Sequence, residues 1–117
     1  MNKIKEIQNH LIAMYDSETW ENFVDNCELG DCQFIAKVVK DDFKQYNIEH
    51  VFGEIEIDEP YIDDYGDEQD MMTHHWNLLD GDIVDFSKGT LAEHIEFDDI
   101  YDPENIEQHR YKQIFIK

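Results

Sequence analysis

The chain has 117 residues, 41% hydrophobic and 13% aromatic, and its 29 acidic and 9 basic residues give a formal net charge of −20. This length suits one domain over residues 1–117, and the apolar fraction suffices for a core, which argues against global disorder. Such a negative field repels nucleic acid and anionic membranes, so we expect no direct nucleic-acid partner and no membrane partner. With no apolar run long enough to span a bilayer and no signal-peptide pattern at the N-terminus, we expect a cytoplasmic protein.

Helical periodicity dominates the first part of the chain, where apolar residues recur three and four positions apart. This spacing predicts a helix over residues 3–15. A second, short helix should follow, and Asp16 or Ser17 can serve as its N-cap because both side chains accept a backbone hydrogen bond.

A turn over residues 26–31, centred on Gly30, leads into a third amphipathic helix. This helix should begin at Cys32 and end near residues 46–47. A thiol at this position lies at the positive end of a helix dipole, which favours the thiolate form.

Strand-like alternation replaces the helical pattern in the second half. An acidic loop is expected over residues 58–70, and Asp80-Gly81 is a typical hairpin turn. Helices followed by a mostly antiparallel sheet define an α+β fold. The expected strands share apolar and polar alternation and cover residues 48–57, 71–79, 82–86 and 110–116.

No cofactor and no metal site are expected. Cys27 and Cys32 have a C-x4-C spacing, which matches neither a redox C-x-x-C motif nor half of a two-pair zinc site. In a reducing cytosol no disulfide between them is expected, and Cys27 is interpreted as a packed structural thiol. The acidic loop lacks the regular register of a calcium-binding EF-hand.

The residue types of a cysteine nucleophile site do occur in order along the chain: a cysteine, then a histidine, then a carboxylate. Two motifs carry them, and together they resemble the papain-like superfamily of cysteine hydrolases, in particular its small transglutaminase-like and cell-wall-peptidase-like branches. The resemblance covers roughly residues 26–90. Its motifs are the turn Gly30-Asp31-Cys32 with Ala36, and His74-x-Trp76 followed by Asp80-Gly81 and Asp85.

This resemblance implies helices packed on a sheet and a role for each motif residue. Cys32 would be the nucleophile, His74 would take its proton, and Asp85 would orient the other ring nitrogen. The backbone N–H of Cys32 would meet the oxyanion. Papain-like enzymes place a glutamine six residues before the nucleophile; Asn26 stands there, and its shorter amide is the candidate second donor.

His75 remains an alternative base at this stage. Neighbouring residues of a strand point to opposite faces, so only one of His74 and His75 can face the site. The His-x-Trp motif and the eleven-residue step to Asp85 favour His74.

Three functions follow from these observations. The first is a cysteine-dependent hydrolase or acyltransferase, such as a peptidase, deamidase or transglutaminase-like enzyme, acting on an amide of a peptide or protein, with basic substrates favoured by the acidic surface. The second is an acidic inhibitor, of the kind phages encode, that mimics nucleic acid and binds a basic partner. The third is an inactive papain-like module that uses its groove for binding. The oligomeric state stays open.

Overall fold

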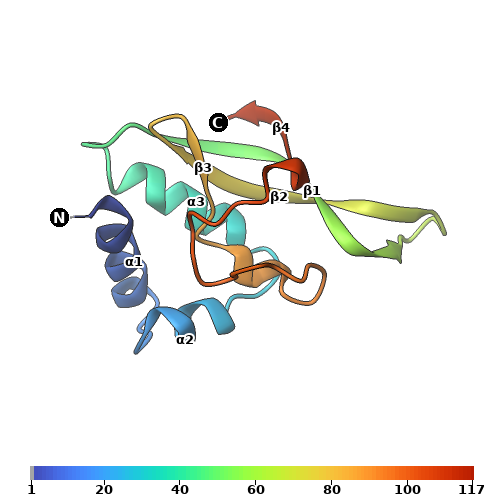
Figure 1. The fold of residues 1–117 in the computed structure, drawn as a ribbon, viewed down its shortest axis with the longest axis horizontal. Coiled ribbons are helices and arrows are strands. Elements are labelled where there is room, and N and C mark those ends of the chain that lie inside the picture. Colours follow the sequence, from blue (N-terminus) through green and yellow to red (C-terminus); the bar gives the residue numbers. More distant parts are fainter. Residues whose placement is uncertain (1) are drawn as a thin grey trace.

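The computed structural model describes residues 2–117 and confirms the α+β class. The four strands form one antiparallel sheet in the order β3-β2-β1-β4. In Figure 1 the three helices lie on one side of this sheet. Within residues 2–117, no helix has the length and hydropathy needed to cross a membrane. The elements are α1 (Lys3–Met14), α2 (Trp20–Asp25), α3 (Asp31–Asp41), β1 (Ile48–Ile62), β2 (Glu68–Leu79), β3 (Asp82–Val84) and β4 (Tyr111–Ile116), with 3₁₀ turns at Lys88–Leu91 and Gln108–Arg110.

The cap of α2 differs from the sequence prediction. Thr19 is the N-cap, and its hydroxyl accepts a hydrogen bond from the Asn22 backbone N–H at 3.1 Å. Asp16 and Ser17 instead close the end of α1, because their backbone N–H groups bond to carbonyls in its last turns. The prediction that either of them caps α2 was therefore wrong.

Helix α3 begins at Asp31, one residue before the predicted start, and ends earlier than predicted. Gly30 has a φ of 97°, a left-handed conformation that glycine adopts without steric cost. The predicted end near residues 46–47 was wrong, since Asp42 is the C-cap. Phe43 lies beyond the last turn and turns into the core, where it is 5% exposed.

The acidic region between the first two strands is a hairpin rather than a loop. β1 continues to Ile62 and β2 starts at Glu68, so only the residues between them form the turn. Backbone pairing, interrupted by a register shift between Glu56 and Tyr61, extends both strands despite their acidic side chains. Residues 59–68, the hairpin arm, project from the body (Figure 1).

The remaining strands follow the predictions with small shifts. Asp80 and Gly81 have φ values of 53° and 90°, as a type I′ hairpin turn requires. β3 ends at Val84, two residues earlier than expected, because the chain leaves the sheet at Asp85 to bond with Pro103.

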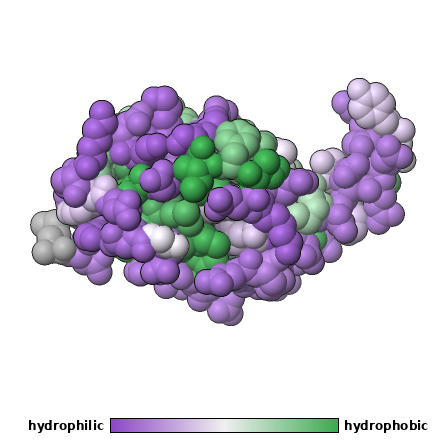
Figure 2. Space-filling model, turned by 90° about the horizontal axis from the view of Figure 1, so that it is seen from above, coloured by the Kyte–Doolittle hydropathy of each residue, from purple (hydrophilic) through white to green (hydrophobic). Residues whose placement is uncertain are grey.

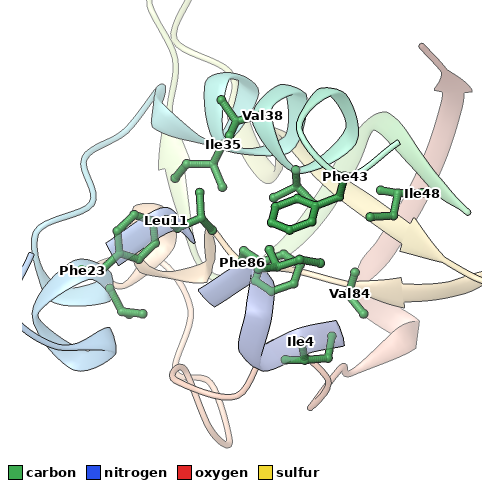
Figure 3. Close-up of a cluster of buried hydrophobic side chains, with 12 residues drawn as sticks. Ile4, Leu11, Phe23, Ile35, Val38, Phe43, Ile48, Val84 and Phe86 are labelled. Atoms are coloured by element: carbon green, nitrogen blue, oxygen red, sulfur yellow. The ribbon is translucent and has the colours of Figure 1, made fainter. Parts of the chain in front are cut away.

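Two hydrophobic clusters cover the two faces of the sheet. They take alternate residues of the strands, which is why they lie on opposite faces. The first joins the helices to the sheet through Ile4, Leu11, Phe23, Ile35, Val38, Phe43, Ile48, Val84 and Phe86 (Figure 3). The second packs the C-terminal segments on the other face through Val51, Ile55, Ile57, Trp76, Leu91, Ile95 and Tyr111.

We predict that Gly53→Ala lowers the free energy of unfolding by about 1–3 kcal/mol, the usual cost of overpacking a core. A Cβ atom at Gly53 would collide with the Lys112 carbonyl and the Trp76 ring, so β4 and Trp76 would both have to shift. Chemical denaturation measures the change, with Thr73→Ala on the exposed side of β2 as the control. Equal stability of the two variants would contradict the packing described here.

Candidate active site

Cys32 lies at the start of α3. It is the second residue of the helix and is 8% exposed. The helix packs against β1 and β2. The buried Asn77 amide ties it to both strands, donating to the Ala36 carbonyl at 3.0 Å and to the Glu49 carbonyl at 3.1 Å. The position of the thiol is therefore set by the contact between helix and sheet.

His74 and Asp85 form a fully buried pair. His74 Nε2 lies 2.8 Å from Asp85 Oδ2, and neither side chain has any exposed surface. The other ring nitrogen, Nδ1, has no hydrogen-bond partner among the described residues. Of the two neighbouring histidines it is His74 that meets the carboxylate, in line with the spacing in the sequence.

Three further donors hold the Asp85 carboxylate. The Tyr111 hydroxyl donates to Oδ2 at 2.7 Å, the same oxygen that His74 contacts. The Ser87 backbone N–H and its hydroxyl both donate to Oδ1 at 3.0 Å. A carboxylate with this many donors is fixed in orientation, and it fixes the imidazole in turn.

The electrostatics of the pair favour two charged groups. Burial alone would lower the pKa of His74, but the charge of Asp85 and its hydrogen bond outweigh burial and raise that pKa to about 10. Burial alone would raise the pKa of Asp85, but His74, Tyr111 and Ser87 hold it below its ordinary value. The surroundings of His74 therefore favour the imidazolium form that it takes once it has accepted a proton.

Cys32 lies close enough to His74 to affect it. The thiol contributes, after Asp85, to the raised pKa of His74. The structure shows no hydrogen bond between these two described side chains, and Nδ1 stays unpartnered. An unpartnered buried ring nitrogen is costly, so this position favours an approaching acceptor or donor.

His75 lies in a different environment from His74. Its Nδ1 is 2.8 Å from His50 Nε2, and its ring packs against Phe52. Burial lowers the pKa of both His50 and His75 to about 4. These two rings are neutral at pH 7 and do not contact Asp85.

Asn26 is placed at the end of α2 rather than at the His74–Asp85 pair. Its amide donates to the Asn22 carbonyl at 2.8 Å, and the residue is exposed. The other cysteine, Cys27, donates its thiol hydrogen to the Phe23 carbonyl at 3.2 Å. Burial, together with the charges of Asp31 and Asp85, raises the pKa of Cys27 to about 12.

Tyr111 and Lys88 are site neighbours that sequence reasoning missed. Tyr111 lies 26 positions after Asp85, so no local pattern connects them. Lys88 is 1% exposed and its ammonium donates to the Asp99 and Asn105 carbonyls, which holds the loop behind Asp85. Ser87, two residues after Asp85, follows the ordinary pattern of an Asx turn and could have been predicted.

Among residues 2–117, no group of three or more histidine, cysteine, aspartate or glutamate side chains is arranged to hold a metal ion. Comparisons with protein-family models, curated proteins and solved structures found no match to this chain. Function is therefore inferred from the geometry of the site.

We predict that Tyr111→Phe destabilises the fold by about 1–3 kcal/mol, because a buried carboxylate loses one of its donors. Burial and Asp85 raise the pKa of Tyr111 well above its ordinary value, so the hydroxyl keeps its proton and donates. Urea denaturation measures the loss. Tyr61→Phe, on the hairpin arm, removes an exposed hydroxyl and should change little.

A second prediction concerns pH. Because the pKa values of His50 and His75 are about 4 in the folded protein, below the ordinary 6.5, the unfolded chain binds more protons between these values. The contribution of the two neutral rings to the free energy of unfolding is therefore complete above pH 6.5 and is lost as the pH falls towards 4. Unfolding free energies at pH 7 and 5 should therefore differ more in the native protein than in His75→Gln.

The exposed His109 supplies the control for this comparison, since His109→Gln should keep the native difference between the two pH values. If His75→Gln and the native protein respond identically, the two buried neutral rings do not contribute to acid sensitivity.

Proposed function

We propose that the protein is a cysteine-dependent hydrolase or acyltransferase that acts on an amide bond of a peptide or protein. The observation that carries the proposal is the buried His74–Asp85 pair, which leaves Nδ1 of His74 unpartnered while the Cys32 thiol lies near enough to raise the pKa of that ring. The resemblance to papain-like enzymes at Cys32, His74 and Asp85 supports the same assignment.

The proposed reaction uses Nδ1 as the proton carrier. With Nε2 held by Asp85, Nδ1 takes the thiol proton, giving a thiolate and an imidazolium. The thiolate attacks the amide carbonyl carbon, and the tetrahedral intermediate expels the amine, which receives the proton from Nδ1. Water, or a second amine, then gives a proton to Nδ1 and attacks the thioester, which releases the acyl group and restores the thiol.

Negative charge on the carbonyl oxygen would be stabilised at the start of α3. The backbone N–H of Cys32 belongs to the first turn of this helix, where N–H groups lack intrahelical partners. The amide nitrogen of Asn26 carries two N–H groups, one of which donates to the Asn22 carbonyl, and the other is the candidate second donor.

The test is the pH dependence of Cys32 alkylation by iodoacetamide. An ordinary thiol, with a pKa of about 8.5, is ionised to only roughly 0.3% at pH 6. We expect Cys32 of the native protein to react at pH 6 at least about tenfold faster than an ordinary thiol ionised to that extent, because the imidazolium of His74 stabilises the thiolate. Tandem mass spectrometry assigns the label to Cys32 or Cys27.

Two matched variants complete the experiment. His74→Gln should remove the fast reaction at pH 6, whereas His75→Gln, one residue along on the other face, should keep it. Circular dichroism checks that both variants fold. A Cys32 that reacts as an ordinary thiol in the native protein would refute the enzyme proposal and leave a binding role for this fold.

A further inference from the structure

A surface cavity of about 380 Å³ lies beside the turn that leads to Cys32. Its walls come from the end of α1, from α2 and from the turn between α2 and α3. The lining residues include Tyr15, Asp16, Glu18, Phe23, Cys27 and Asp31.

One wall of this cavity is aromatic. The rings of Tyr15 and Phe23 meet edge to face with centroids 5.1 Å apart. Trp20 stacks on the Phe23 ring, with centroids 4.8 Å apart. Phe34, from α3, approaches Tyr15 at 6.3 Å. Because Phe23 is buried against Trp20, Tyr15 is the lining ring with exposed surface, held in place by its neighbours, and such a ring attracts an ammonium or guanidinium group through its quadrupole.

The remaining wall supplies negative charge without any counterion from the described residues. Asp16, Glu18 and Asp31 line the cavity, and none of them forms an ion pair with a described basic side chain. Burial and the charge of Asp31 raise the pKa values of Tyr15 and Cys27 to about 12. The phenol and the thiol therefore stay neutral, and the cavity carries carboxylate charge only.

The cavity wall is next to the proposed nucleophile in the chain. Asp31 directly precedes Cys32, and consecutive Cα atoms are about 3.8 Å apart. The charge of Asp85 also helps to raise the pKa of Cys27, which lines the cavity. The cavity and the buried pair therefore lie within electrostatic range of each other.

We propose that this cavity is a substrate subsite that binds a lysine or arginine side chain at, or one residue before, the carbonyl that Cys32 attacks. The aromatic wall and the unpaired carboxylates would recognise the cation together, and neutral side chains of the same length would bind more weakly. This inference rests on the proposed function, and it names the class of amide substrate that the site prefers: basic peptides.

The test uses matched peptide chloromethyl ketones that carry arginine or its neutral isostere citrulline, placed at the ketone residue in one pair and one residue before it in another. The Cys32 thiolate displaces chloride and forms a thioether, so the rate reports binding followed by one defined step. Mass spectrometry locates the label, so Cys27, a wall residue, need not be replaced. We expect the arginine probe to react at least about tenfold faster than its citrulline partner in one pair, with the preference falling as salt rises.

The ratio of arginine to citrulline rates is then compared in two variants with the same charge change. Asp16→Asn, at a left-handed position that asparagine tolerates, should reduce the ratio about threefold or more, as expected for losing one nearby charge. Asp64→Asn, on the hairpin arm, should leave the ratio unchanged.

The outcomes separate this inference from the proposed function. If Cys32 reacts rapidly with iodoacetamide at pH 6 but both probe pairs give a ratio near one, the subsite is refuted and the nucleophile stands. An equal loss of preference in Asp16→Asn and Asp64→Asn also refutes the subsite, because overall charge would then explain it. If Cys32 is inert towards every reagent, both proposals fail.

Discussion

The buried hydrogen bond between His74 and Asp85 is the interaction on which the rest of this structure depends. Removing a carboxylate and an imidazole from water is expensive, and the cost is offset only when both groups are paired and further hydrogen-bonded. Tyr111 and Ser87 provide those bonds, so elements far apart in the sequence meet at one carboxylate. Loss of one of these contacts would leave the buried charge less fully compensated.

Contacts within the sheet bring other side chains to this pair. Gly53 lets the β4 backbone and the Trp76 ring approach β1 closely, which brings Tyr111 to Asp85. Across the sheet, Asn77 holds α3 against the strands and thereby positions Cys32. The mostly polar surface, interrupted by a few apolar patches (Figure 2), surrounds this interior. The proposed chemistry thus depends on packing that no single element provides.

The high negative charge has a local as well as a general meaning. Twenty net negative charges create a field that repels anions and attracts cations. At the end of α1 the same excess leaves carboxylates without counterions beside an aromatic wall, one residue from Cys32 in the chain. A surface that composition describes only as acidic acquires a candidate binding site through the way α1, α2 and the following turn meet.

The sequence alone was sufficient to predict the α+β class, the first helix and the turns at Gly30 and Asp80-Gly81. It also favoured His74 over His75 as the partner of Asp85. Each of these features depends on the spacing of residues close together in the chain. Tertiary contacts decided the rest. Helix α3 stops at Asp41, and Phe43 is buried beyond its last turn. The acidic segment pairs as a hairpin because backbone hydrogen bonds do not depend on side-chain charge. Tyr111 reaches Asp85, and Asn26 turns to Asn22, through contacts that spacing along the chain does not encode.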